Sequence, residues 1–229
     1  MMPSSRSFPA ILFLLSFNAF PLLQAQVATK AEQDTRARAS LDMMRKRYEG
    51  FTTLEIPLRM DTEIPGQGVE VRKGLFQRKG IRYRLVMDSQ TVFSDGKALY
   101  VVLPEDKEVQ IDALPLGSEG EDELSPEALF RIYRRKDLSY YLLEEFSEKG
   151  RMLQRIGFKP TDRNAEYTKM EMVLDRKTGE VLTFKVFSRD GSRYTVTFGA
   201  TRANQPLPDG LFQWRKSDYP GYHVEDLRS

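Results

Sequence analysis

The stretch LEIPLRMD at residues 54–61 alternates apolar and polar side chains. Its apolar members are Leu54, Ile56, Leu58 and Met60. Successive side chains of a β-strand point to opposite faces of the sheet, so this period of two predicts a strand with one apolar face. Proline has no N–H to donate to a ladder, so Pro57 predicts either a sheet edge or a β-bulge in this strand.

The same alternation returns through the rest of the chain. The expected strands lie at residues 81–87, 99–103, 109–111, 140–146, 151–159, 167–174, 181–187 and 193–198. Short turns such as Ser94-Asp95-Gly96-Lys97 separate them. Short antiparallel strands with one apolar face must curl to bury that face. The expected fold class is therefore mainly β (α+β), as an unclosed antiparallel β-barrel with a helical lid.

One amphipathic helix is expected at residues 31–49. Its apolar residues recur at helical spacing, at Ala37, Leu41, Met44 and Tyr48. Gly50 follows directly and can adopt the left-handed conformation that ends many helices. This helix is available to cover the open barrel.

A second, short helix is expected after a polar loop at residues 112–126. Ser125-Pro126-Glu127 is a typical helix start, with serine as N-cap and proline in the first turn. Leu129, Ile132 and Tyr133 then share one face. So short a helix has few apolar surfaces to pack on except the barrel mouth, and we expect these three residues to form the lid.

The N-terminus has the layout of a secretory signal peptide. Arg6 precedes an apolar run from Ala10 to Phe20, and Pro21 and the small residue Ala25 follow. We expect cleavage near Ala25. Residues 1–25 are then the signal peptide, and residues 26–229 form one exported, periplasmic domain.

The composition argues against several function classes. The chain has no cysteine, which excludes disulfides, thiol catalysis and a lipid anchor on cysteine. Without residues 1–25 it has 34 basic and 33 acidic residues, which argues against nucleic-acid binding. The only histidine, His223, has no nucleophile or metal-ligand spacing near it. We expect no enzyme, no catalytic residue, no metal and no cofactor.

Methionine is frequent on the expected apolar face. Its flexible thioether adapts to irregular shapes, which suits a ligand such as an acyl chain, although an ordinary hydrophobic core would show the same pattern. The candidate acyl-chain cavity consists of the residues on the inward phase of the strands: Leu54, Ile56, Leu58, Met60, Tyr83, Leu85, Met87, Met170, Met172, Phe184, Val196 and Phe198.

Several of these segments, taken in order, resemble the outer-membrane lipoprotein carrier proteins, the LolA family. The resemblance rests on the helix ending near Tyr48, the strand 54–60, Gly74-Leu75-Phe76, the run VFSDGKALY at 92–100 and the segment 172–184. The tail YPGYHVEDLR at 219–228 is similar to the Bacteroidetes-type members. Each motif is loose, but their order and spacing make the match specific.

The resemblance implies a barrel that shields the acyl chains of lipoproteins. Such proteins accept a lipoprotein from an inner-membrane lipoprotein-releasing ABC transporter and pass it to an outer-membrane acceptor. The implied partners are therefore acylated lipoproteins, that transporter and that acceptor, for a monomer that binds no nucleic acid. The family's gating arginine falls on Lys79, with Arg78 beside it, so these two cations are the gating candidates.

A second function class remains open. A non-catalytic lipid-binding or envelope-stress sensor module of the same fold would have the same sequence features. Each buried methylene contributes about 0.8 kcal/mol, so one long acyl chain costs on the order of 10 kcal/mol to hold in water. That cost favours a carrier, and a lipoprotein bound to the purified protein would separate the two alternatives.

Overall fold

The computed structural model describes residues 30–114 and 129–228. The expected signal peptide at 1–25 and the expected helix start at Ser125 lie outside these described residues. Within the described ranges, no helix is both long and apolar enough to cross a lipid bilayer.

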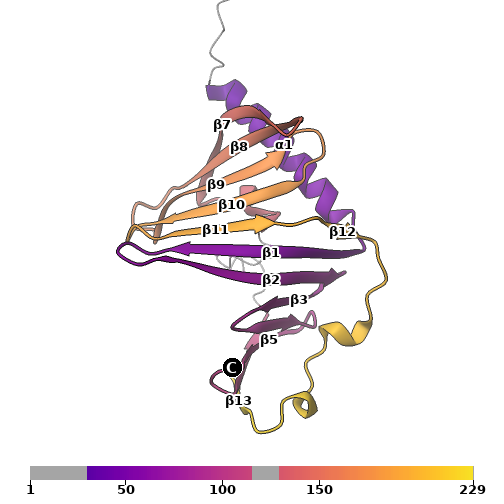
Figure 1. Cartoon of the computed structure of the whole chain (residues 1–229). Coiled ribbons are helices and arrows are strands. Elements are labelled where there is room, and N and C mark those ends of the chain that lie inside the picture. The colour runs from indigo at the N-terminus through magenta and orange to yellow at the C-terminus, as the bar shows by residue number, and fades with distance from the viewer. Residues whose placement is uncertain (1–29, 115–128, 229) are drawn as a thin grey trace, which may run out of the picture.

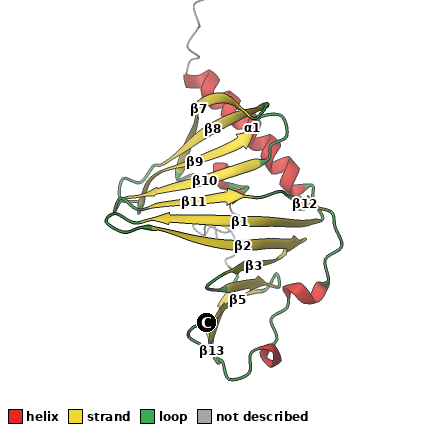
Figure 2. Ribbon diagram, viewed as in Figure 1, coloured by secondary structure: helices red, strands yellow, loops and turns green. Residues whose placement is uncertain are grey.

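One long helix and a series of short strands form the described part of the chain (Figure 2). The helix is α1 (Lys30–Glu49). The strands are β1 (Thr53–Glu63), β2 (Val69–Lys79), β3 (Arg82–Met87), β4 (Thr91–Ser94), β5 (Ala98–Leu103), β6 (Glu108–Ala113), β7 (Leu138–Glu148), β8 (Arg151–Pro160), β9 (Tyr167–Asp175), β10 (Val181–Ser188), β11 (Arg193–Phe198), β12 (Arg202–Ala203) and β13 (His223–Asp226). Short 3-10 helices lie at η2 (Ile132–Arg134), η3 (Asp209–Phe212) and η4 (Lys216–Asp218).

All strands belong to one sheet whose two ends do not meet. The strand order is β13-β6-β5-β4-β3-β2-β1-β11-β10-β9-β8-β7, and β12 pairs with β1 beside β11. Every pair is antiparallel except β13, which runs parallel to β6. Figure 1 shows the sheet curving over α1, with β13 and β7 at its far ends. The unclosed, mainly β architecture expected from the sequence is confirmed.

Helix α1 packs on the inner face of the curved sheet. Its apolar stripe, Ala37, Leu41, Met44 and Tyr48, is completely buried in the main hydrophobic core. The same core contains residues of the long strands on the inner face, such as Ile56 and Met172. The helix therefore fills part of the volume that a closed barrel would enclose.

Pro57 does not lie at a sheet edge, so that part of the prediction is wrong. Strand β1 lies between β2 and β11, in the middle of the sheet. The predicted bulge is present: pairing with β11 ends at Leu58–Phe198 and pairing with β12 starts at Glu55–Arg202. Two residues of β1 thus face three of the partner segment. A bulge, like an edge, leaves a ladder position that needs no N–H donor.

The apolar residues of β6 face outward rather than inward. Val109 pairs with Val102, and Ile111 pairs with Tyr100, whose side chains lie on the outer face. There they form a second hydrophobic cluster with Phe93, and Trp214, Tyr219, Tyr222 and Val224 from the C-terminal segment pack against it. The sheet is therefore covered on its inner face by α1 and, at one end, on its outer face by the C-terminal segment.

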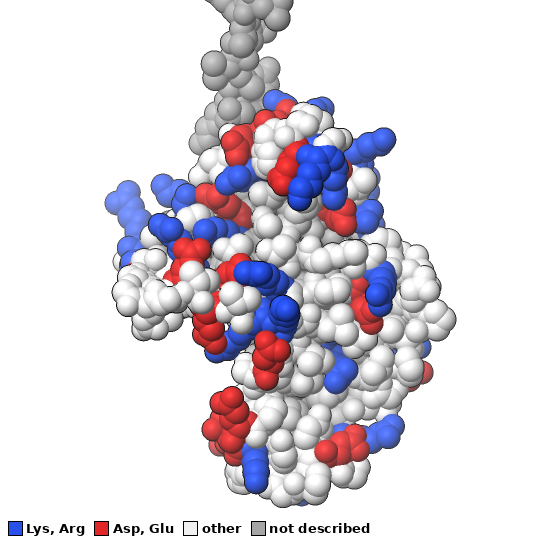
Figure 3. Space-filling model, viewed as in Figure 1, with Lys and Arg blue, Asp and Glu red and all other residues white. Residues whose placement is uncertain are grey.

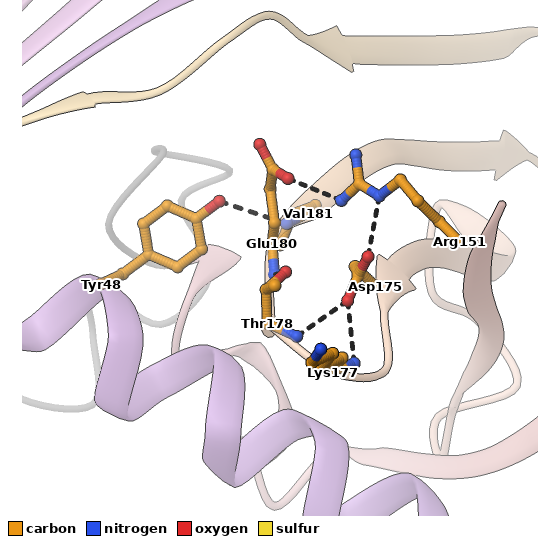
Figure 4. A network of polar contacts seen from close by, with 7 residues as sticks. All are labelled: Tyr48, Arg151, Asp175, Lys177, Thr178, Glu180 and Val181. Atoms are coloured by element: carbon orange, nitrogen blue, oxygen red, sulfur yellow. Dashed lines mark hydrogen bonds and ion pairs between the residues drawn. The ribbon is translucent and has the colours of Figure 1, made fainter. Parts of the chain in front are cut away.

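A tight turn between β9 and β10 contacts α1 (Figure 4). Asp175 accepts hydrogen bonds from the backbone amides of Lys177 and Thr178, both at 2.8 Å. Arg151 donates to Asp175 at 2.7 Å and to Glu180 at 2.6 Å. Partial burial acts to raise the pKa of Asp175, but Arg151 and the two amides outweigh it and lower the pKa below its usual value. The turn is therefore held by the ionised carboxylate of Asp175 and its three hydrogen-bond donors.

This turn touches the helix at two points. The backbone amide of Val181 donates to the hydroxyl of the buried Tyr48 at 3.2 Å. Gly179 has φ +68°, and a Cβ atom there would lie 2.8 Å from the backbone nitrogen of Met44. Glycine is needed here for two reasons: it adopts the left-handed conformation without strain, and its missing side chain lets the turn approach the helix closely.

Gly179→Ala is expected to destabilise the protein more than Gly150→Ala. Both glycines have positive φ, but no atom lies within 4 Å of a Cβ built on Gly150. The left-handed backbone alone costs an alanine roughly 1–2 kcal/mol, and the contact with helix backbone adds about 1–3 kcal/mol of overpacking. Urea unfolding of the two variants measures the difference. Equal free energies of unfolding would show that α1 does not depend on this contact.

Candidate functional site

The twelve predicted cavity residues share the inner face of the sheet. Directly paired residues of an antiparallel ladder point to the same side, so the register decides their orientation. One row runs across the sheet through Met60, Val196, Phe184 and Met172. Met170 lies two residues from Met172 on the same strand and is also completely buried.

The other half of the face is built from β1, β2 and β3. Three residues of β1 align with three residues of β3 across the strand β2 between them. The aligned pairs are Leu54 with Tyr83 (through Arg78), Ile56 with Leu85 (through Phe76) and Leu58 with Met87 (through Gly74). On the other side of β1, Leu58 pairs with Phe198. A Cβ atom at Gly74 would lie 2.3 Å from the sulfur of Met87, so this methionine lies directly over the glycine.

Burial divides this face into two regions. Leu54, Ile56, Met170 and Met172 are at most 1% exposed, where α1 and its neighbours cover the sheet. By contrast, Leu58, Met60, Met87, Val196 and Phe198 are only partly buried. Their pairings make these five residues neighbours on β1, β3 and β11. We call them the accessible patch; it continues directly into the buried region.

The predicted lid residues lie in the main core. Leu129, Ile132 and Tyr133 are all buried there, and η2 begins at Ile132. Phe130 between them stacks on the ring of Tyr48 at a centroid distance of 3.9 Å and an angle of 8°. The segment 129–135 thus packs against the C-terminal half of α1. Sequence reasoning missed Phe130 because it lies off the helical face on which the other three were predicted.

Polar contacts hold this segment to the helix. The hydroxyl of Tyr133 donates to Asp42 at 2.6 Å and accepts from Nε of Arg45 at 2.9 Å. Partial burial and the Asp42 carboxylate raise the pKa of Tyr133, so the hydroxyl keeps its proton. Nε of Arg131 lies 3.4 Å from Oε1 of Glu49 at the rim. The segment therefore combines buried apolar side chains with polar contacts to the helix.

The two gating candidates point to opposite faces. Arg78 shares the inner face with Leu54, and its Nη2 donates to the backbone oxygens of Tyr48 at 2.6 Å and of Phe51 at 3.1 Å. Lys79 lies on the outer face, where Nζ donates to the oxygen of Leu207 at 3.0 Å and pairs with Asp209 at 2.9 Å. Neighbouring residues of a strand alternate sides, so Lys79 cannot reach the helix. Of the two, only Arg78 is placed to hold α1.

Other inner-face residues are absent from the predicted set. Phe76, Ile156 and Phe158 are completely buried on this face. Phe76 pairs with Ile56, Ile156 pairs with Met172, and Phe158 pairs with Met170. Their period of two was readable along their strands, but their alignment with the predicted residues depends on register.

The inner face can bind apolar groups without covalent chemistry. Its surface is aliphatic, aromatic and thioether, and such a surface accepts flexible hydrocarbon by burial alone. The polar groups at its border, Arg78 and Tyr133, contact the covering elements.

A family model matches this chain. The model described as "Outer membrane lipoprotein carrier protein LolA" matches residues 69–215, which is more than half of the chain. Among curated proteins, no sequence matches.

Solved structures of similar shape cover most of the chain. An uncharacterized conserved protein from Thermus thermophilus has a TM-score of 0.55 at 10% identity, over 83% of this chain and 98% of that chain. A LolA superfamily protein from Nitrosomonas europaea has a TM-score of 0.42 at 14% identity, over 78% and 97%. Lipoprotein LppX from Mycobacterium tuberculosis has a TM-score of 0.46 at 11% identity, over 79% and 99%. At these identities, the Thermus likeness shows the fold alone.

Arg78→Met is expected to loosen the end of α1, whereas Lys79→Met is not. A hydrogen bond from a charged group contributes about 1.5–3 kcal/mol, and Arg78 donates to the carbonyl of Tyr48 in the last turn of the helix and to that of Phe51 just after it. Hydrogen exchange of the amides at residues 46–50 and urea unfolding measure the effect. Unchanged exchange in Arg78→Met, or an equal increase in Lys79→Met, would contradict a role for Arg78 in holding the helix.

Proposed function

Because the chain belongs to the outer membrane lipoprotein carrier protein LolA family, we propose that it is a periplasmic carrier. It binds the acyl chains of lipoproteins released from the inner membrane and delivers them to the outer membrane. The binding is non-covalent, so the protein is not an enzyme and needs no cofactor. The proposed partners are the lipoprotein, an inner-membrane lipoprotein-releasing ABC transporter and an outer-membrane acceptor.

The accessible patch is the observation that carries this proposal. Leu58, Met60, Met87, Val196 and Phe198 give an acyl chain an apolar surface to land on, and the buried region continues it beneath α1. Burial of a long acyl chain releases on the order of 10 kcal/mol, which can offset the opening of contacts that cover the face. Methionines on both parts let the surface adapt to chains of differing length.

The covering elements supply the reversibility that a carrier needs. In the empty protein, Phe130 on Tyr48 and Tyr133 on Asp42 close one side of the face. An incoming acyl chain would displace the segment 129–135 and exchange those contacts for its own burial. The segment returns when the chain leaves, so the closed state favours release. Arg78 fixes the end of α1 and would set how readily the helix moves with the segment.

The direct test is to purify the mature protein from its native periplasm under mild conditions and to measure its mass without denaturation. A lipoprotein carrier retains acylated polypeptides, which tryptic digestion identifies by their N-terminal lipid. If phospholipid or fatty acid alone copurifies, even when lipoproteins accumulate, the protein binds lipid without carrying lipoproteins.

Val196→Glu is expected to weaken the binding of a fluorescent fatty acid at least about tenfold. The new carboxylate would enter the accessible patch, where an acyl chain must desolvate it. Thr197→Glu is the matched control because the neighbouring residue faces outward and pairs with Arg59. Titration of both folded variants gives the affinities. Equal affinities would show that acyl chains do not bind on this face.

Locking the segment 129–135 onto α1 is expected to block lipoprotein uptake. The chain has no native cysteine, so Arg131→Cys with Glu49→Cys can be bridged selectively by a short bis-maleimide. Arg59→Cys with Asp61→Cys, bridged on the outer face of β1, is the control for the chemistry. Uptake of a detergent-released lipoprotein is compared before and after bridging. Full uptake by the locked protein would refute the lid role.

A further inference from the structure

A pocket on the outer face lies apart from the apolar inner face. Its volume is about 340 Å³, and it lies between the start of β3, the turn before β5 and the segment that follows η3. Arg82, Asp95, Lys97, Gln213, Trp214 and Arg215 line it. Over the surface visible in Figure 3, basic and acidic residues are interspersed. The pocket departs from that mixture because three cations and one acid meet in a confined space.

The single acid of the pocket is already engaged by protein donors. Oδ1 of Asp95 accepts from the amides of Lys97 at 2.7 Å and Ala98 at 2.9 Å, and Oδ2 accepts from the hydroxyl of Tyr100 at 3.2 Å. Partial burial acts to raise the pKa of Asp95, but these three donors outweigh it and lower the pKa. The carboxylate therefore shapes the turn and leaves the side-chain ammonium of Lys97 available to a ligand.

The cations of the pocket exceed their partners. Asp209 pairs with Arg82 at 2.8 Å and with Lys79 at 2.9 Å, so one carboxylate serves two cations. Arg215 donates only to the neutral amide of Gln213, at 3.3 Å, among the hydrogen bonds of the described residues. The lining of the pocket thus has excess positive charge.

The indole of Trp214 forms part of the wall of the pocket. Its ring stacks on Tyr100 at a centroid distance of 5.3 Å and an angle of 14°, which fixes the position of the ring. Nε1 is buried and has no hydrogen-bond partner among the described residues. The atom has almost no exposed surface, so the indole contributes its fixed ring to the wall of the pocket rather than a hydrogen bond to a ligand.

We propose that this pocket binds a phosphate group, presented either by a soluble phosphate ester or by a phospholipid headgroup. A phosphate has three or more acceptor oxygens and up to two negative charges, which suits two guanidinium groups and an ammonium. A carboxylate offers only two oxygens and one charge. The site is independent of the acyl-binding face, so its failure would leave the proposed carrier function unaffected.

Trp214 provides a direct readout because it is the only tryptophan of the chain. We expect saturable quenching or enhancement of its fluorescence when the mature protein is titrated with glycerol 3-phosphate at constant ionic strength. Lys97→Gln and Arg215→Gln should each weaken the apparent affinity about tenfold or more, the loss of one charge-assisted hydrogen bond. Lys216→Gln, an exposed neighbour that does not line the pocket, is the matched control and should bind as the wild type does.

Two further arms identify the source of the phosphate and the role of the indole. Vesicles of phosphatidylglycerol, compared with soluble glycerol 3-phosphate, show whether a lipid headgroup binds more tightly than the free ester. Calorimetry on Trp214→Phe, which keeps an aromatic ring but removes the N–H, should show an affinity within about twofold of the wild type, because Nε1 is not exposed in the pocket. The proposal is overturned if neither probe gives a saturable signal, or if Lys97→Gln and Arg215→Gln bind as tightly as Lys216→Gln.

Discussion

The rest of the structure depends on the need to bury one apolar face of a sheet that does not close. Because β13 and β7 lie at opposite ends of the strand order and do not pair, the sheet cannot cover its own inner face. Helix α1 and the segment 129–135 supply the missing cover, and the turn at Gly179 fixes the helix against β9 and β10. Each of these elements is placed by its contact with the inner face.

Helix α1 and the segment 129–135 cover the inner face through two kinds of contact, apolar burial and hydrogen bonds. Tyr48 and Met44 of α1 are completely buried among strand side chains, as in an ordinary protein core. The segment 129–135 buries Leu129, Phe130 and Ile132 in the same core and adds hydrogen bonds around Tyr133. Burial of apolar surface is hard to reverse in water unless another apolar group replaces it, whereas hydrogen bonds can be exchanged with water at little net cost. Both covering elements are therefore part of the core, and the shorter one is also held by exchangeable polar contacts.

Much of the fold could be predicted from the sequence because period-two alternation reports which residues share a face. That rule placed Leu54 through Met60 correctly, and the sheet register aligned them with Val196 and Phe184. It could not decide which face was inward for β6, because that depends on pairing with β5. Lys79 shows the same limit. The family resemblance placed the gating cation at Lys79, but this residue lies on the opposite side of the strand from its neighbour Arg78. Phe130 was beyond reach because its partner, Tyr48, is distant in sequence.

The two ends of the sheet bear on how such a protein stays separate from its own copies. A long uncovered strand is a template for pairing with another chain, and an apolar interior raises the danger. Strand β13 occupies the free side of β6, yet it is only four residues long and carries His223, Glu225 and Asp226. At the opposite end, a register shift between Leu142 and Glu144 interrupts β7. Irregularity at both ends makes the open sheet a poor seed for fibre growth, so the fold keeps an open apolar face without pairing with other copies along its edges.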